Sequence, residues 1–256
     1  MAFRDRTKMG GDRSTFTTTH WSVILEARTY DPARQREVLN HLMGRYWKPV
    51  YCYLRCKGYS NDAAKDLTQG FFERVVLGKH LIQKADPQKG RFRTFMLSAL
   101  DRYEVSHHRA TSRKKRCPRD EPFSLDVIED CCMPPQSREM EPHELFTHVW
   151  ASSLLDDILA EVKQGCLRDN LQIHWELFRS HVLEPIFQGG SAPMLRDLCR
   201  RFGVADEAKA GNMTITVKRR FQVAVRQRMR QYVNSDEQVD DEVRDLMRIL
   251  SKGSAG

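Results

Sequence analysis

The sequence has no long hydrophobic run and none of the short motifs that mark common enzyme families. No apolar stretch approaches the roughly 18 residues that a membrane-spanning helix needs, and the polar, charged N-terminus is unlike a secretory signal. The phosphate-binding loop, GxGxxG, GxSxG and HExxH patterns do not occur. These absences predict a soluble, cytoplasmic protein that is not an enzyme.

The seven cysteines also lack a recognisable pattern, because their number is odd and no CxxC pair occurs. Cys131 and Cys132, together with His143 and His148, come nearest to a zinc site. Adjacent cysteines fit a tetrahedral site poorly, however. The sequence therefore predicts buried or idle thiols, no metal and no cofactor.

The net charge of +8 is distributed unevenly along the chain. Residues 89–116 carry nine Lys or Arg against two acids, and residues 208–233 carry seven against none. Between these basic blocks, residues 117–145 carry eight acids against two Arg. The asymmetry indicates nucleic acid as a partner, and the alternative is a set of solvated helix faces.

Hydrophobic spacing typical of helices recurs through the chain and predicts an all-α fold of two small domains. Prolines gather in the acidic block, which indicates an extended linker. The expected division is a disordered N-terminus 1–15, a helical bundle 16–115, an acidic Pro-rich linker 116–144, a helix-turn-helix domain 145–235, and an acidic C-terminal helix and tail 236–256.

Local signals set several element boundaries. Pro49 lies inside a helical pattern and should kink or split that helix, and Gly58 should end it. Ser60 or Asn61 should cap the next helix. A Gly- and Ser-rich loop is expected from Pro185 to Pro193.

The helix that begins near Asn61 has an apolar face and a separate polar face. Leu67 and Phe71 belong to the apolar stripe that should face a core. The polar residues should remain on the surface, where they form a candidate protein-docking face: Asp62, Asp66, Gln69 and Glu73.

From Gly90 onward, aromatic residues interleave with basic ones, a pattern suited to single-stranded DNA. The helical spacing of Phe92, Phe95 and Tyr103 favours a core role for these rings over stacking on bases. The candidate DNA contacts in this block are therefore its polar and basic side chains: Lys89, Arg91, Arg93, Arg102, His107, Arg109 and Arg113.

The pattern from Leu195 to Gly203 predicts the first helix and turn of a helix-turn-helix. A candidate recognition helix follows, capped by Asp206 or Asn212, although the β-branched run 214–217 leaves a strand as an alternative. Its early part would enter the major groove. The candidate contacts there are Lys209, Asn212, Thr214, Thr216, Lys218 and Arg219.

The arginines later in the candidate recognition helix have a different expected role. A recognition helix reads bases with its N-terminal residues, so side chains further along should touch phosphates or water. These side chains are Arg220, Arg226, Arg228 and Arg230.

Several of these segments resemble bacterial RNA polymerase sigma factors of the extracytoplasmic-function class. The run TTHWS at residues 18–22 is similar to a motif of one branch of that class. YWKPVY at 46–51 and DLTQGFF at 66–72 resemble its first core helices, and GRFRTF at 90–95 resembles its promoter-melting helix. TVKRRF at 216–221 resembles its second-domain recognition helix.

The resemblance implies a transcription initiation factor with sigma region 2-like and region 4-like domains. Asp66 and Gln69 would dock on core RNA polymerase, the helix from Arg91 to Arg113 would open the minus-ten element, and the helix from Lys209 would read the minus-thirty-five element. The acidic linker would follow the RNA exit path. The implied partners are core polymerase and promoter DNA, both duplex and single-stranded. The resemblance also allows an anti-sigma factor or other regulator as a partner.

The sequence departs from the family in two places. Arg102 and Ser106 stand where the melting helix usually carries Asn and Asp, and the turn from Ala205 to Gly211 looks longer than usual. A stand-alone helix-turn-helix regulator, which binds duplex DNA without polymerase, remains the alternative. The two readings differ in the docking face, which only the first requires.

Overall fold

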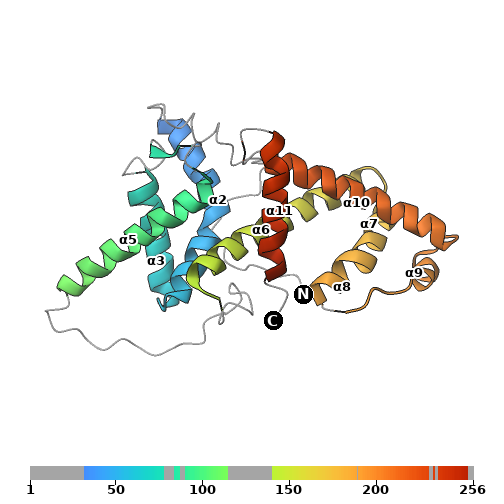
Figure 1. Ribbon diagram of the computed structural model, residues 1–256, viewed down its shortest axis with the longest axis horizontal. Coiled ribbons are helices and arrows are strands. Elements are labelled where there is room, and N and C mark those ends of the chain that lie inside the picture. The colour runs from blue at the N-terminus through green and yellow to red at the C-terminus, as the bar shows by residue number, and fades with distance from the viewer. Residues whose placement is uncertain are drawn as a thin grey trace. The chain divides into compact units, whose positions relative to one another are not determined.

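The computed structural model describes residues 32–77, 84–86, 90–114, 140–188, 190–230, 233 and 236–252. The regular elements in these segments are all helical, as the sequence predicts (Figure 1). None of the helices in the same segments is long and apolar enough to cross a membrane. The predicted disordered N-terminus 1–15, the TTHWS run and nearly all of the linker 116–144 lie outside the described residues.

Contacts divide the chain into two units, and the boundary falls between Ala151 and Ser152. This point lies inside helix α6 (Pro142–Arg168). Residues 142–151 of α6 therefore belong to the first unit, and the boundary is later than the residue 145 that the sequence indicates. The reason lies in the side chains of that stretch, which contribute to the core of the first unit.

The first unit contains α2 (Pro32–Cys56), α3 (Asn61–Phe71), the π-helical continuation η1 (Phe72–Leu77) and α5 (Phe92–Lys114), together with the start of α6. The helix α2 runs through Pro49 without being split, whereas the sequence left a split open. Pro49 removes one backbone hydrogen bond, but it lies between the fully buried Tyr46 and Val50. Packing on both sides offsets the lost bond.

The connection from α2 to α3 follows the predicted signals. Gly58 has φ of 88°, and its N–H donates to the carbonyl of Arg55 while the N–H of Tyr59 donates to that of Leu54, at 2.9 and 3.2 Å. This is the Schellman arrangement that ends a helix at glycine. Ser60 is the cap of α3, because its hydroxyl accepts from the N–H of Ala63 at 3.3 Å.

The core of the first unit joins three helices. The ring of Tyr46 in α2 lies 5.7 Å from Phe92 in α5 and 6.4 Å from Phe146 in α6, centroid to centroid. The guanidinium of Arg93 lies over the ring of Trp150 at 4.6 Å. These contacts explain why the start of α6 belongs to this unit.

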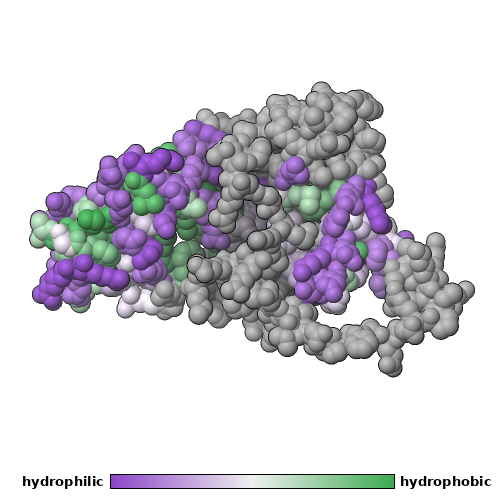
Figure 2. Space-filling model, turned by 180° about the vertical axis from the view of Figure 1, so that it is seen from behind, coloured by the Kyte–Doolittle hydropathy of each residue, from purple (hydrophilic) through white to green (hydrophobic). Residues whose placement is uncertain are grey.

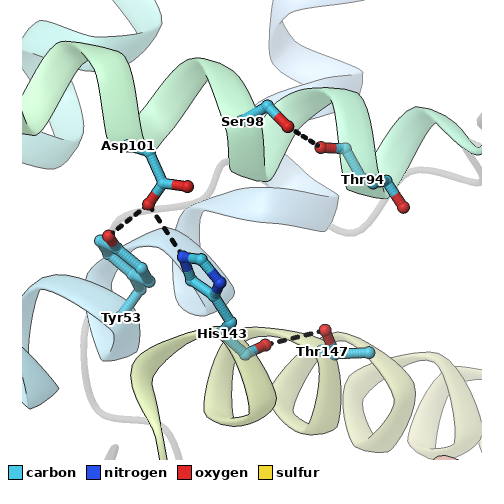
Figure 3. A network of polar contacts seen from close by, with 6 residues as sticks. All are labelled: Tyr53, Thr94, Ser98, Asp101, His143 and Thr147. Atoms are coloured by element: carbon cyan, nitrogen blue, oxygen red, sulfur yellow. Dashed lines mark hydrogen bonds and ion pairs between the residues drawn. The ribbon is translucent and has the colours of Figure 1, made fainter.

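A polar network joins the same three helices (Figure 3). The hydroxyl of Tyr53 in α2 donates to Oδ1 of Asp101 in α5 at 2.6 Å, and Nε2 of His143 in α6 lies 3.0 Å from the same oxygen. The rings of Tyr53 and His143 also stack, with centroids 5.9 Å apart. Burial, followed by the bond to Asp101, raises the pKa of Tyr53 well above its usual value, so the hydroxyl remains a donor.

The second unit contains the rest of α6, then α7 (Gln172–Phe178), η5 (Arg179–Leu183), α8 (Glu184–Gln188), α9 (Leu195–Phe202), α10 (Glu207–Arg230) and α11 (Asp236–Lys252). Helix α10 packs against α7, α9 and α11. The acidic C-terminal helix predicted from residue 236 is thus present as α11, with Val239 and Leu246 buried.

The segment between α7 and α9 differs from its prediction. Helical structure continues through Pro185 to Gln188, whereas the sequence predicts a loop from Pro185. The start of α8 follows η5 without a break, and the N–H of Glu184 donates to the carbonyl of Arg179. Pro185 therefore removes one backbone bond of this stretch without ending it. The remaining loop returns toward η5, where Nδ1 of His181 lies 3.0 Å from the carbonyl of Pro193.

Candidate nucleic-acid interface

Helices α7, α9 and α10 form a three-helix arrangement with its own small core. Four buried residues, Leu177, Leu198, Cys199 and Ala210, make up this core. Partly buried apolar side chains close it at the edges: Leu195, Phe202, Val204 and Met213. This core holds α9 and α10 together with α7.

The turn between α9 and α10 is short and well defined. Gly203 ends α9 with φ of 68°, a left-handed conformation that glycine adopts without strain. Asp206 precedes α10, and its Oδ1 accepts from the N–H of Lys209 at 2.7 Å. Asp206 is therefore the cap, and the alternatives of an Asn212 cap, a strand at 214–217 and a lengthened turn are all wrong.

The early part of α10 presents most of the predicted contact residues to solvent. Five of the six candidates are exposed: Lys209, Asn212, Thr216, Lys218 and Arg219. Thr214 is the exception, because only 7% of it is exposed and its hydroxyl donates to the carbonyl of Ala210 at 3.0 Å. Thr214 faces the core and cannot read a base from there.

The basic residues of α10 fall into two groups. Within the described part of the chain, Lys209, Lys218 and Arg219 form no ion pair. Three later arginines are paired inside the unit instead: Arg220 with Asp169 at 2.5 Å, Arg226 with Asp240 at 2.8 Å and Arg228 with Glu161 at 2.7 Å.

For Arg228 the expectation of a contact with phosphate or water is wrong, whereas Arg220 and Arg226 stay partly exposed beside their acids. Arg228 is buried, and the acids come from α6, the turn after it and α11, which are distant in sequence. The cations without an ion pair, Lys209, Lys218 and Arg219, thus lie ahead of these three arginines in the described helix.

Helix α9 adds basic side chains that the sequence analysis did not single out. Arg196, Arg200 and Arg201 are exposed, and Arg201 lies over the ring of Phe202 at 5.2 Å. The sequence already contained the signal for them, because three arginines fall within the eight residues of α9. The exposed surface at the α9 and α10 end of the molecule is largely hydrophilic, with small apolar patches (Figure 2).

In the first unit, α5 keeps its acids away from its basic face. Asp101 accepts from Tyr53, and Glu104 accepts from the hydroxyl of Tyr59 at 2.9 Å. Both bonds use the side of α5 that faces the end of α2. The exposed Arg102 therefore has no competing acid from within the segment 89–116.

The candidate contacts on α5 separate by exposure. Arg102 and Arg109 are exposed, whereas Arg91 and His107 are half-buried, and the His107 ring lies 6.4 Å from that of Tyr103. Arg93 is buried beside Trp150, so its predicted solvent-facing role is wrong. Lys89 and the side chain of Arg113 lie outside what the structure describes.

The candidate docking face on α3 and η1 is exposed as predicted. The side chains of Asp62, Asp66, Gln69 and Glu73 all face solvent, and Nε2 of Gln69 donates to Glu73 at 2.8 Å. The opposite side of α3 is anchored by the fully buried Ala64 and Phe71. An acidic strip that carries one amide results, and its charge complements a basic partner surface.

Two further kinds of site, a metal centre and a reactive thiol, can be judged from the described residues. They contain no group of three or more His, Cys, Asp or Glu that could hold a metal ion. Burial raises the pKa of the Cys56 and Cys166 thiols, which keeps them protonated near neutral pH. The candidate pair Cys131 and Cys132 lies outside the described residues.

Comparison of the chain with protein-family models, with curated proteins and with solved structures gives no match. The geometry of the described residues defines the class only as all-helical.

Proposed function

We propose that the chain is a transcription initiation factor that binds core RNA polymerase, directs it to specific promoters, and recognises and melts promoter DNA. The observation that carries this proposal is the helix-turn-helix of α9 and α10. Its recognition helix displays Lys209, Lys218 and Arg219 without ion pairs, whereas three arginines further along pair with acids of the same unit. A surface of this kind fits the major groove and its flanking phosphates.

The first unit supplies the features that distinguish an initiation factor from a simple DNA-binding protein. The acidic strip on α3 is the proposed polymerase-docking face, and the exposed cations of α5 are the proposed contacts to the melted minus-ten element. Both roles rest on the sigma-factor resemblance of these segments. The exposure of Asp66, Gln69 and Arg102 is compatible with them.

The experiment that tests the proposal is binding of the purified full-length chain to core RNA polymerase. Tight one-to-one binding is expected, and Asp66→Ala and Gln69→Ala should each weaken it. Asp241→Ala is the matched control, because Asp241 is an exposed acid on α11 that pairs with Arg244 of the same helix. This control should bind polymerase as the wild type does.

Each result assigns the function differently. Loss of binding in the α3 variants alone supports the initiation factor, and mapping of the promoters opened by the complex follows. A folded chain that ignores polymerase but holds specific duplex DNA contradicts the proposal. That outcome would instead identify a stand-alone helix-turn-helix regulator.

A further inference from the structure

An apolar side chain is exposed among the polar residues of α10. Ile215 is 46% exposed. It precedes Val217, which is fully buried, by two residues, and two residues turn an α-helix through about 200°. Ile215 therefore points away from Val217, on the solvent-facing half of the helix.

The residues around Ile215 on this face are polar or small. Asn212 and Gly211 lie one turn before it, and Arg219 lies one turn after it, at the spacing that places side chains on one face. Asn212 and Arg219 are both exposed. Ile215 is thus a single apolar contact group between two side chains able to read base edges.

Packing gives no reason for the glycine at position 211. A Cβ placed there would meet nothing within 4 Å, although glycine inside a helix is less stable than alanine. A glycine permits another molecule's surface to come close to the helix backbone, and the space beside Gly211 leaves room for it. The same face therefore combines one apolar side chain with one site of close approach.

We propose that Ile215 reads the methyl group of a thymine in the major groove, with Gly211 allowing the helix to approach the bases closely. The thymine methyl is the apolar group that the major-groove edge of a base pair presents, and apolar side chains recognise it by contact. This inference rests on the proposed DNA-reading function of α10. It adds a base preference to that function, carried by a residue outside the predicted contact set.

The test begins with selection of duplexes from a random-sequence pool by the full-length chain, with and without core polymerase. Each thymine of the enriched site is then replaced by deoxyuridine, which removes only the methyl group. Binding of every duplex is measured for the wild type and for Ile215→Ala. Val223→Ala is the matched control, because Val223 is another exposed β-branched residue of α10.

For the wild type, loss of one thymine methyl should weaken binding about fourfold, the equivalent of about 0.8 kcal/mol for one buried methylene-sized group. Ile215→Ala should bind the methylated and unmethylated duplexes equally, whereas Val223→Ala should keep the fourfold difference. The inference is overturned if the enriched site contains no thymine, or if every methyl effect survives in Ile215→Ala.

Gly211→Ala supplies a second, independent readout. It should raise the melting temperature, because a helical glycine is replaced in open space, yet weaken binding to the enriched duplex. Gly165→Ala in α6 is the control, since its Cβ would meet only the Arg168 side-chain end at an ordinary 3.9 Å, and it should leave DNA binding unchanged. If Gly211→Ala binds the duplex as well as the wild type, close approach at this position is refuted.

These outcomes separate the inference from the proposed function. A chain that binds polymerase and enriches a site, but shows no methyl effect dependent on Ile215, keeps the function and loses the inference. A chain that enriches no duplex, alone or with polymerase, loses both.

Discussion

Arg93 provides the sharpest test of the structure against the sequence. The sequence places it among the solvent-facing DNA contacts, but the structure buries it with its guanidinium 4.6 Å from the Trp150 ring centroid. A desolvated cation–π contact contributes about 2 kcal/mol, and the buried aliphatic stem adds packing. We therefore expect Arg93→Ala to lower the free energy of unfolding by about 2–4 kcal/mol.

The assay is urea unfolding followed by far-ultraviolet circular dichroism. Arg102→Ala is the control, because Arg102 lies on the same helix and is exposed. It should change the free energy of unfolding by no more than about 0.5 kcal/mol. Arg93→Met keeps most of the apolar stem and should fall between Arg93→Ala and the wild type.

The reverse pattern would refute this reasoning. If Arg93→Ala unfolds at the wild-type urea concentration and instead loses affinity for single-stranded DNA, Arg93 is a ligand contact. The sequence interpretation would then hold, and the packing of α6 against α5 would have to be revised.

Three further predictions concern single contacts. Glu161→Gln leaves the buried Arg228 without its carboxylate partner and should lower the free energy of unfolding in urea by about 1–3 kcal/mol. Asp169→Asn breaks a more exposed pair and should lower it by less than about 1 kcal/mol. Equal effects would contradict the burial of Arg228. Burial, followed by the hydrogen bond to Glu104, raises the pKa of Tyr59 from 10.0 to about 12. The stabilisation that this shift contributes is therefore complete below pH 10 and is lost as pH rises through 12. Tyr59→Phe should flatten the pH dependence of the free energy of unfolding in that range. Gly203→Ala places a side chain at φ of 68° and should lower the free energy of unfolding by about 1–2 kcal/mol. The cost comes from the backbone, because a Cβ there meets no atom within 4 Å. An unchanged melting curve would show that the turn relaxes.

Features that depend on neighbouring residues in the sequence were the ones that the sequence predicted well. The end of α2 at Gly58, the exposed strip of α3 and the acidic helix α11 follow from local conformational preference and helical periodicity. The start of α10 was ambiguous because Asp206 and Asn212 are both good caps. The structure favours Asp206, since the earlier start places Ala210 in the core with Leu198.

Features that depend on distant segments were predicted poorly. Arg93 follows Phe92 in a basic run, and nothing local shows that Trp150 covers it. Arg228 likewise has the sequence neighbours of a surface cation, and nothing local shows that the fold brings Glu161 beside it. Thr214 is different, because its spacing from Ala210 and Val217 already places it on the core stripe, and periodicity alone would have removed it from the contact set.

The position of the unit boundary inside α6 has a consequence for how this chain can be divided. Cutting at the end of the acidic linker, near residue 145, would remove Phe146 and Trp150 from the first unit and uncover the sides of Tyr46 and Arg93 that these rings contact. Cutting after Ala151 keeps those contacts but severs a continuous helix and exposes fresh ends on both fragments. The two halves are therefore poor candidates for exchange as independent modules, and recombination between related chains should preserve α6 whole.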